Sequence, residues 1–410
     1  MVKPGYKQTE IGVIPEEWEC CNIEQYGQIY GGGTPSTNIP KYWDGAIAWC
    51  TPSDITKTAG KYISKTDRTI TIDGLNNSAA TLMPNNSILL CTRATIGELK
   101  LCSIPMTTNQ GFKNIILNGE NSPDFLYYLL QIKKDDMYAL AIGSTFLELS
   151  KTNLCKIALQ RPPFPEQQKI ATALSDIDAL ITNLEKLIAK KKAIKQGAMQ
   201  ELLTGKRRLP GFGGVWETVR LGDHCAVLRG GSPRPIQAYL TSSPQGANWI
   251  KIGDVREGDK YITATAERII EAGISKSREV FVGDFILSNS MSFGRPYILK
   301  INGCIHDGWL VIQNYQDSFD QQYLYYVLGS DMVKSQYISM AAGSSVQNLN
   351  KEKVGNVMLH KPDIEEQHSI AAILSDMDEE ISKYEHQLRK YKGVKQGMMS
   401  ELLTGRIRLV

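Results

Sequence analysis

An internal duplication is the feature that most constrains how this chain can fold. The segment "PEQQKIATALSDIDALI" at 165–181 returns as "IEEQHSIAAILSDMDEEI" at 364–381, and "KQGAMQELLTGKRRL" at 195–209 returns as "KQGMMSELLTGRIRL" at 395–409. Residue 166 matches residue 366 and residue 209 matches residue 409, so the offset is 200 (366 − 166 and 409 − 209) with no gap. About half of the intervening positions are identical. This similarity indicates that the chain contains one structural unit twice.

The regions that precede these blocks also match each other, although more loosely. "GGGTPS" (31–36) corresponds to "RGGSPR" (229–234), and "NQGF" (109–112) corresponds to "HDGW" (306–309). The chain therefore has the order A–B–A′–B′, with diverged A units and well-matched B units. The predicted boundaries are 1–163 and 210–362 for the A units, and 164–209 and 363–410 for the B units.

The A units have the pattern of mixed α/β domains. Short apolar runs such as "SILLC" and "DFILS" stand between Gly, Pro and Asn turn signals, which is typical of strands. Each A unit also has one clear helical stretch, "SPDFLYYLLQIKK" (122–134) in the first and "SFDQQYLYYVLGS" (318–330) in the second. Each stretch begins with Ser or Asp residues that can cap free backbone amides, so we expect one capped helix there in each A unit.

The B units have the pattern of long coiled-coil helices. Apolar residues recur at alternating spacings of four and three, which forms a heptad seam. The predicted seam residues are Ile170, Leu174, Ile177, Ile181, Leu184 and Ile188 in the first block, and Ile370, Leu374, Met377, Ile381, Tyr384, Leu388 and Tyr391 in the second.

A long helix with one apolar stripe needs a partner, and the matching block is the nearest candidate. Because the intervening A′ unit lets the chain return, we expect the two helices to pair antiparallel. Lys195 and Lys395 fall on the seam, where a polar residue can fix the register. Gly197 and Gly397 lie inside the helices, which indicates either a close helix approach or a local bend. The sequence thus predicts an α+β protein: two mixed α/β domains separated by two long antiparallel coiled-coil helices, with a pseudo-twofold internal repeat.

Composition narrows the class of protein. The 42% hydrophobic and 22% charged fractions are typical of a soluble globular chain. We find no apolar run of membrane-spanning length, no apolar leader in "MVKPGYKQTEIG" and no CxxC pair among the eight cysteines, so we expect a cytoplasmic protein without a membrane contact. A net charge of +3 permits nucleic-acid binding without requiring it.

Known catalytic motifs are not matched. "RPPFPEQQ" (161–168) superficially resembles the motif with which amino methyltransferases hold their target base, but the position that would bond the base is Arg161, and its counterpart is Lys361. "GGGTPS" is not followed by a GxxxxGK[ST] phosphate loop, and the five histidines show no HxxxH or HExxH spacing. We therefore expect no catalytic residue and no metal ligand in this chain, and we interpret 161–168 as a helix entry.

The doubled pattern of Glu-Gln, long helix and Leu-Leu-Thr-Gly closely resembles the specificity subunits of type I restriction-modification systems. "IGVIPEEWE" (11–19) and "GFGGVWETVRLGD" (211–223) also look like the starts of their two variable domains, so the resemblance covers essentially the whole chain. It implies that each A unit is a target recognition domain that reads one half of a split site in double-stranded DNA.

The same resemblance implies the partners. The B helices would set the spacing between the half-sites and dock two modification subunits, which carry adenosylmethionine and methylate adenine. Restriction subunits, which use ATP and Mg, would join through the modification complex. This chain itself would hold no cofactor.

Candidate base-reading residues are polar side chains on Gly-flanked loops, since Arg pairs with guanine and Asn or Gln with adenine. Arg93 and Arg295 are the preferred candidates because each lies next to a matched turn, although they do not align with each other. The basic ends at 206–208 and at Arg406 and Arg408 are expected to contact phosphate or to cap helix carbonyls. The full set of candidates is Thr34, Ser36, Ser53, Arg93, Thr95, Gln110 and Lys113 in the first unit, and Ser232, Arg234, Lys251, Asn289, Ser290, Ser292, Arg295 and His306 in the second.

Three other functions remain open at this level. The chain could be a bivalent coiled-coil DNA-binding regulator unrelated to restriction-modification, which would bind DNA alone and ignore a methyltransferase partner. It could be a methyltransferase or nuclease with its own site, against which the missing cofactor motifs argue. A purely structural coiled-coil protein would leave two large loop-rich domains unexplained.

Overall fold

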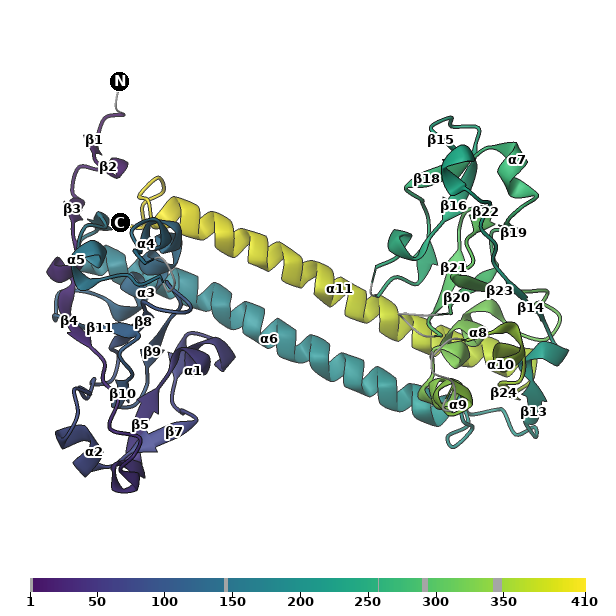
Figure 1. Ribbon diagram of the computed structural model, residues 1–410, viewed down its shortest axis with the longest axis horizontal. Helices are drawn as coiled ribbons and strands as arrows, with labels where there is room; N and C mark the ends of the chain where they lie inside the picture. Colours follow the sequence, from purple (N-terminus) through teal and green to yellow (C-terminus); the bar gives the residue numbers. More distant parts are fainter. Residues whose placement is uncertain (1–2, 144–146, 257, 290–293, 342–348) are drawn as a thin grey trace. The chain divides into compact units, whose positions relative to one another are not determined.

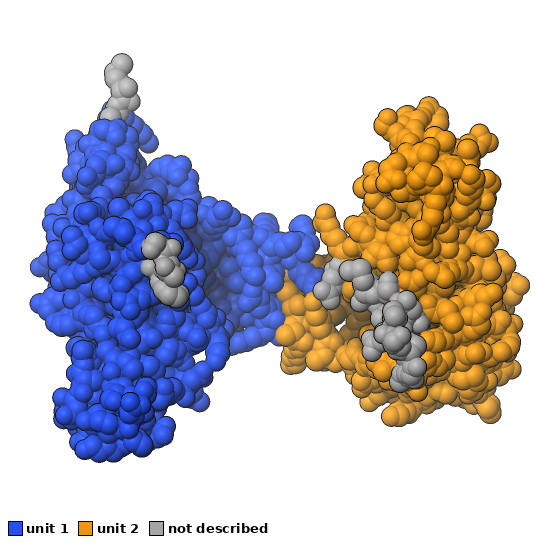
Figure 2. Space-filling view, in the orientation of Figure 1, with its two compact units in different colours: residues 1–186, 385–410 blue, residues 187–384 orange. Residues whose placement is uncertain are grey.

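A computed structural model of the chain describes residues 3–143, 147–256, 258–289, 294–341 and 349–410 (Figure 1). The chain divides into two compact units, coloured separately in Figure 2. Unit 1 comprises Met1–Lys186 and Glu385–Val410, and unit 2 comprises Leu187–Tyr384. Each unit therefore contains one A segment, the beginning of one long helix and the end of the other.

Unit 1 is built on a five-stranded sheet in the order β4-β11-β8-β9-β6, next to a smaller sheet in the order β10-β5-β7. Neighbours in the larger sheet are antiparallel except β6 and β9, and β10 is parallel to β5. The strands of these sheets are β4 (Gly27–Gly31), β5 (Trp43–Cys50), β6 (Tyr62–Ile63), β7 (Arg68–Ile70), β8 (Ile88–Cys91), β9 (Leu99–Cys102), β10 (Met106–Thr108) and β11 (Phe112–Leu117). Two small antiparallel pairs complete the unit: β1 (Tyr6–Thr9) with β2 (Gly12–Pro15), and β3 (Glu19–Cys21) with β12 (Leu159–Arg161).

The main helix of unit 1 is α3 (Pro123–Ile132), where Ser122 accepts a hydrogen bond from the Phe125 amide as the predicted cap. Its apolar residues are buried in a core that also takes in Ile170, Leu174 and Leu403 from the long helices and the turn after α11. The remaining short helices are α1 (Pro52–Lys57), α2 (Ile72–Asn76), α4 (Lys134–Ala139) and α5 (Lys151–Leu154).

Unit 2 repeats this design with the same strand order, β14-β23-β20-β21-β17, and the same pattern of directions. Its second sheet, β15-β18-β16-β22-β19, contains the counterpart of β10-β5-β7 as β22-β16-β18. The strands of unit 2 are β13 (Glu217–Arg220), β14 (Ala226–Arg229), β15 (Leu240–Thr241), β16 (Ala247–Ile250), β17 (Tyr261–Ile262), β18 (Glu267–Ile269), β19 (Arg278–Val280), β20 (Phe285–Ser288), β21 (Pro296–Leu299), β22 (Gly303–Ile305), β23 (Trp309–Gln313) and β24 (Met358–Lys361), the last paired with β13.

The helix corresponding to α3 is α8 (Gln321–Leu328), which is capped by the Asp320 side chain. Its apolar residues share a core with Leu202, Leu203, Ile370 and Leu374. The other helices of unit 2 are α7 (Glu271–Ile274), α9 (Asp331–Ala341) and α10 (Lys351–Gly355).

Two 39-residue helices, α6 (Phe164–Leu202) and α11 (Ile364–Leu402), form the B blocks. Within unit 1, Asp178 of α6 pairs with Lys395 of α11 at 2.7 Å, and Glu185 pairs with Lys392. Rising numbers on one helix meet falling numbers on the other, so the pairing is antiparallel. In unit 2, Lys191 pairs with Glu380 and Lys195 pairs with Asp378 in the same sense. All of the heptad residues on both helices are buried or half-buried. The predicted α+β fold with two antiparallel long helices is confirmed.

Each long helix begins at a buried carboxylate that binds an arginine near the end of the other B block. In unit 1, Glu166 accepts hydrogen bonds from Arg408 Nε at 2.7 Å and from Trp18 Nε1 at 2.9 Å. In unit 2, Glu366 accepts from Arg208 Nε and Trp216 Nε1, both at 2.8 Å. Arg208 and Arg408 therefore bind carboxylates and do not cap helix carbonyls, whereas Arg406 Nη2 donates to the Ser400 carbonyl at 3.3 Å, as the carbonyl-capping expectation has it.

Of the two explanations for the glycines inside the helices, the structure excludes a close helix approach. A Cβ added to Gly197 or Gly397 would have no atom within 4 Å, so no helix approaches closely there. Asp178 of α6 is not free on the outer face, since it binds Lys395 and the Tyr128 hydroxyl and its side chain is only 28% exposed. No helix in the described ranges is both long enough and apolar enough to span a membrane.

Candidate nucleic-acid interface

The glycine-rich stretches predicted to match each other form equivalent loops in the two units. In unit 1 the loop follows β4, and the Gly33 amide donates to the Thr108 carbonyl at 2.9 Å. In unit 2 the loop follows β14, and the Gly231 amide donates to the Ile305 carbonyl at 3.1 Å. A Cβ at Gly32 would lie 1.9 Å from the Asn109 carbonyl oxygen, so this position must lack a side chain for the loop to approach the turn after β10. In the same way, a Cβ added to Gly230 would lie 2.1 Å from the His306 carbonyl oxygen.

The turn that faces each loop is also built alike. The Gly111 amide donates to Asn109 Oδ1 at 2.9 Å in unit 1, and the Gly308 amide donates to His306 Nδ1 at 2.6 Å in unit 2. This bond places the intervening residue, Gln110 or Asp307, at the tip of the turn.

A loop hydroxyl bonds each tip residue. Thr34 Oγ1 donates to Gln110 Oε1 at 2.5 Å, and Ser232 Oγ donates to Asp307 Oδ1 at 2.7 Å. We call these contacts the loop–turn pairs. Each pair joins two residues that are far apart in the sequence, and the two pairs occupy corresponding positions in the two units. Thr34, Gln110 and Ser232 are predicted candidates, and Asp307 directly follows the candidate His306.

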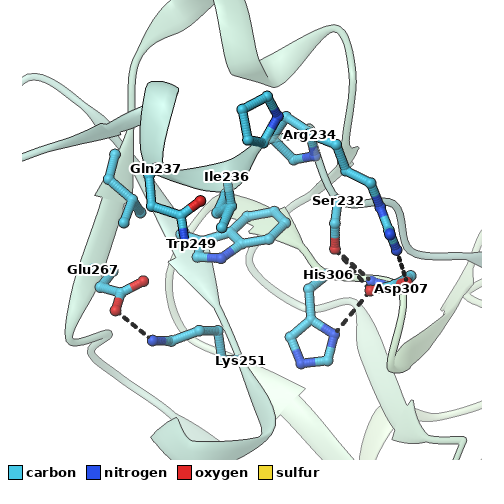
Figure 3. Close-up of a pocket in the computed structure, with 12 residues that line it drawn as sticks. Ser232, Arg234, Ile236, Gln237, Trp249, Lys251, Glu267, His306 and Asp307 are labelled. Atoms are coloured by element: carbon cyan, nitrogen blue, oxygen red, sulfur yellow. Dashed lines mark hydrogen bonds and ion pairs between the residues drawn. The ribbon is translucent and has the colours of Figure 1, made fainter.

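The loop–turn pair of unit 2 includes an arginine (Figure 3). Arg234 Nη2 lies 3.3 Å from Asp307 Oδ2, while the Arg234 side chain remains 80% exposed. The hydrogen bond from Ser232 and, to a smaller extent, the charge of Arg234 keep the pKa of Asp307 below its usual range, so this carboxylate is charged at neutral pH.

His306 takes a structural part in this cluster. Burial lowers the pKa of His306, so the imidazole is neutral at pH 7 and its Nδ1 can accept the bond from the Gly308 amide. The 3.7 Å contact between His306 Nδ1 and Asp307 is therefore not an ion pair at that pH. The prediction that His306 reads bases has no support in this arrangement, because the Nδ1 atom is used to fold the turn.

The cluster of unit 2 lies at a cavity of about 920 Å³. Trp249, which is 2% exposed, lines this cavity together with Leu240. Lys251, another predicted site residue, also lines it and forms an ion pair with Glu267 at 2.6 Å. Figure 3 shows the indole of Trp249 between the Lys251–Glu267 pair and the Ser232–Asp307–Arg234 group.

The corresponding space in unit 1 is filled. The Trp43 ring meets the Trp49 ring edge-on with centroids 5.0 Å apart, and the Arg68 guanidinium lies 3.6 Å from the Trp43 centroid. Strand register identifies the counterparts. Trp43 pairs with Ile70 as Leu240 pairs with Ile269, and Arg68 pairs with Trp49 as Glu267 pairs with Trp249. The Trp49 indole N–H is bonded to the Gly33 carbonyl at 2.8 Å, which ties this stack to the loop.

The other predicted residues of unit 1 lie outside its loop–turn pair. Arg93, one of the two preferred candidates, binds Glu148 at 2.7 Å, and Lys113 lies 3.7 Å from the same carboxylate. The hydrogen bond from Arg93 lowers the pKa of Glu148, so the pair is ionic at neutral pH. Both cations are thus partly neutralised within the unit. Ser36 is exposed beside the loop–turn pair, Ser53 is exposed on α1, and Thr95 is half-buried in the turn after β8.

The other predicted residues of unit 2 are similarly dispersed. Asn289 is buried, and its Nδ2 donates to the Asp307 carbonyl at 2.8 Å, so it supports the turn. Arg295, the second preferred candidate, is half-buried directly before β21. Ser290 and Ser292 lie outside the described residues.

Sequence reasoning missed Asp307, Trp43 and Arg68. It looked for hydrogen-bond donors and amides that read bases, so an acidic residue was passed over. The match of "NQGF" with "HDGW" nevertheless placed Asp307 opposite Gln110, and this was the available signal. Within the described ranges, no three or more His, Cys, Asp or Glu residues are grouped so that they could hold a metal ion.

Comparison with known proteins identifies relatives over the whole chain. The family model for the type I restriction modification DNA specificity domain matches residues 15–196 and 214–390. The MjaIX specificity subunit of Methanocaldococcus jannaschii is 42% identical over 183 residues, which cover 44% of this chain and 42% of that protein. That alignment therefore spans less than half of the relative. The MjaVIII specificity subunit of the same organism is 23% identical over 415 residues, covering 97% of this chain and 94% of the relative.

Solved structures share the fold. A chain from a study of complex assembly and conformational transition of the type I R-M system aligns with a TM-score of 0.63 at 18% identity, covering 96% of this chain and 99% of the other. The S subunit from M. genitalium aligns with a TM-score of 0.59 at 15% identity, covering 94% and 96%.

Proposed function

Because the chain belongs to the type I restriction modification DNA specificity family, we propose that it is the subunit that gives such a complex its DNA sequence specificity. Unit 1 and unit 2 each contain one recognition domain, and each domain reads one half of a bipartite site in double-stranded DNA. The family match covers two segments, one for each recognition domain and the helix that follows it.

The single observation that carries this proposal is the pair of equivalent loops with different chemistry. The bonds that hold the glycine-rich loop and its facing turn are the same in the two units. The polar groups there are the exposed Thr34 and Gln110 in one unit, and the half-buried Ser232 and Asp307 with the exposed Arg234 in the other. A protein that reads two different half-sites needs one support for two different sets of hydrogen-bonding groups.

The long helices have a second role in this proposal. The antiparallel pair of α6 and α11 sets the length of the unread spacer between the half-sites and offers its outer faces to two modification subunits. Restriction subunits then join through the modification complex. The buried seam supports this role, because burial of the apolar stripe leaves polar residues such as Asn183, Lys186 and Lys190 on the outside. A longer helix pair would change the spacer and leave the bases unchanged.

Catalysis belongs to the partners in this proposal. The modification subunits bring adenosylmethionine and the restriction subunits bring ATP and Mg, and this chain contributes recognition alone.

Genome-wide mapping of methylated adenine tests the proposal. The chain is expressed with its neighbouring modification subunit in a host that lacks its own adenine modification. We expect one bipartite motif, methylated once on each strand in opposite halves. Replacement of residues 1–163 by the equivalent region of another family member should change one half of the motif only.

The same experiment addresses the DNA-binding regulator. Tight bivalent DNA binding by the purified chain, without any methylated motif and without association with the modification subunit, would replace our proposal by that function.

A further inference from the structure

The two loop–turn pairs differ in the groups that they present, and this difference has a direct meaning for DNA. We propose that each pair reads one base pair in the major groove: Gln110 reads adenine in the half-site bound by unit 1, and Arg234, held by Asp307, reads guanine in the half-site bound by unit 2. This inference rests on the proposed function and adds the residues and the bases.

The geometry of unit 1 suits adenine. Adenine offers an N6 donor and an N7 acceptor in the major groove, and a Gln amide matches both. Gln110 is exposed, and the Thr34 hydroxyl bonds its Oε1 atom, which orients the amide. The oxygen keeps a second lone pair for N6–H, and the Nε2 group, which has no partner among the described residues, is available for N7.

The geometry of unit 2 suits guanine. Guanine offers two acceptors, O6 and N7, which match the parallel N–H groups of a guanidinium. Among the described residues, Arg234 uses only Nη2, toward Asp307, so its remaining donors are free on a side chain that is 80% exposed. The electrostatic gain of a phosphate contact depends on net positive charge. Asp307 balances that charge and leaves the hydrogen-bonding edge intact, which favours a base over a phosphate.

Asp307 acts as a positioning residue. Its carboxylate is itself fixed by the Ser232 hydroxyl at 2.7 Å, and its backbone is held by Asn289. A guanidinium anchored at one corner loses less conformational entropy on binding than a free one. Arg234 therefore depends on Asp307 for its orientation, whereas Gln110 depends on Thr34.

Equivalence of the two turns adds a constraint on the DNA. Gln110 follows β10, which is parallel to β5, and Asp307 follows β22, which is parallel to β16. The residue before each one bonds the end of the parallel neighbour: the Asn109 amide donates to the Cys50 carbonyl at 3.0 Å, and the His306 amide donates to the Ile250 carbonyl at 3.4 Å. The two turns should thus face corresponding places in the two half-sites, while the reading side chain comes from the turn in unit 1 and from the loop in unit 2.

The experiment measures the methylation motif of the complex of this chain with its modification subunit, with single substitutions. Gln110→Ala and Arg234→Lys are the main variants, because lysine keeps the positive charge and loses the rigid planar fork that fits guanine O6 and N7. Arg278→Lys in unit 2 is the matched control, since among the described residues the Arg278 Nε bonds a backbone carbonyl, that of Arg229, and no side chain. Asp307→Asn and Thr34→Val test the positioning residues, with Asp307→Glu and Thr34→Ser as the conservative variants.

We expect Gln110→Ala to relax one adenine position in one half-site and Arg234→Lys to relax one guanine position in the other. Discrimination at that position should fall roughly 5- to 150-fold, the range for one two-bond base contact. Asp307→Asn should relax the same guanine as Arg234→Lys, and Asp307→Glu should restore part of the preference. Thr34→Val should relax the same adenine as Gln110→Ala, and Thr34→Ser should keep it. Arg278→Lys should leave every position unchanged.

Three outcomes overturn the inference. The motif is unchanged in the Gln110 and Arg234 variants, or both variants relax the same half, or Arg234→Lys leaves guanine fully preferred. If Gln110→Ala abolishes methylation altogether, the near-isosteric Gln110→Glu replaces it, and an unaltered adenine preference in that variant also rejects the inference. Failure of the proposed function looks different, because the unaltered chain would then yield no bipartite motif.

Discussion

The two units share the carboxylate clusters that support their helix entries and differ in the space beside Trp49 and its counterpart Trp249. In unit 1, Glu166 binds Arg408 and Trp18, and in unit 2, Glu366 binds Arg208 and Trp216. The space beside Trp49 in unit 1, in contrast, holds Trp43 with Arg68 stacked on it. The space beside Trp249 in unit 2 is a cavity of about 920 Å³.

This difference shows which positions the architecture constrains. A buried carboxylate with two donors tolerates no substitution that leaves one partner unsatisfied, so both copies keep the same three residues. A loop that is supported by backbone bonds can change its side chains freely. Duplication has therefore preserved the helix entries and allowed the recognition surfaces to diverge.

The largest expected effect tests the shared supports. Replacing Glu166 by Ala would leave the Trp18 N–H without its partner in a site where the carboxylate is 4% exposed, and it would leave Arg408 with Glu17 as its remaining carboxylate partner among the described residues. We expect Glu366→Ala to lose about 3–5 kcal/mol of folding free energy, because breaking a buried ion pair leaves an uncompensated charge. Glu166→Ala should lose less, about 2–3 kcal/mol, because Glu17 still pairs with Arg408. Thermal denaturation of each variant, followed by hydrogen exchange in each unit, measures the losses.

The matched control for this prediction is Glu185→Ala, which removes a surface pair with Lys392. It should change stability by no more than about 1 kcal/mol. If Glu166→Ala were as mild as Glu185→Ala, the buried cluster would not be a structural support.

Acid should weaken the same support in unit 1. Burial acts to raise the pKa of Glu166, but the hydrogen bonds from Arg408 and Trp18 outweigh it and leave the pKa below its usual value. The stabilisation is therefore complete above the unfolded-state pKa of about 4.3 and is lost as pH falls through the lower folded-state value. Unfolding measured between pH 7 and pH 3 should show the gap between the unaltered chain and Glu166→Gln shrinking at low pH. A gap that widens in acid would contradict this assignment.

The next prediction tests the difference between the units. Trp43→Leu gives unit 1 the residue that unit 2 has at the corresponding position, Leu240, and removes the partner of Trp49 and Arg68. Since Trp43 is 7% exposed, the lost contacts and the space left behind should cost about 2–3 kcal/mol. Denaturation midpoints measure the loss, and hydrogen exchange should place it in unit 1.

The reverse substitution, Leu240→Trp, serves as the control for that prediction. It enters a cavity and an exposed position, so it should not destabilise unit 2 by more than about 1 kcal/mol. Equal destabilisation by both substitutions would show that the stack of unit 1 has no special packing.

The sequence predicted the long helices well because their signals are local. Heptad spacing is read within a few helical turns, and burial of residues such as Leu174 and Leu374 follows the pattern. The strand order could not be predicted in this way. The pairing of β4 with β11 joins segments that are far apart in the chain, and no local pattern specifies it.

The candidate sites were predicted less well for the same reason. Arg93 has the chemistry of a base reader, but its charge is shared with Glu148, which comes from a distant part of the sequence. Arg208 looked available for phosphate, and its partner Glu366 is 158 residues away. Gln110 and Ser232 were identified by type, but their roles depend on the loop–turn pairs, which exist only after the sheets have formed.

The smallest expected effect tests how far the symmetry extends along the helix pair. Lys195 pairs with Asp378, which also binds the Tyr326 hydroxyl, and Lys395 pairs with Asp178, which binds the Tyr128 hydroxyl. These lysines are 19% and 24% exposed, so their pairs are more buried than a surface pair and less buried than the Glu166 cluster. We expect Lys195→Met and Lys395→Met to cost about 1–2 kcal/mol each, because each leaves a half-buried carboxylate with its tyrosine alone. Denaturation of the two variants and of Asp378→Asn and Asp178→Asn measures this. A large loss of stability from one lysine substitution and none from the other would mean that the register of the helices is fixed at one end only. The two units would then share the carboxylate clusters at their helix entries but differ in how the lysine pairs hold the two helices together.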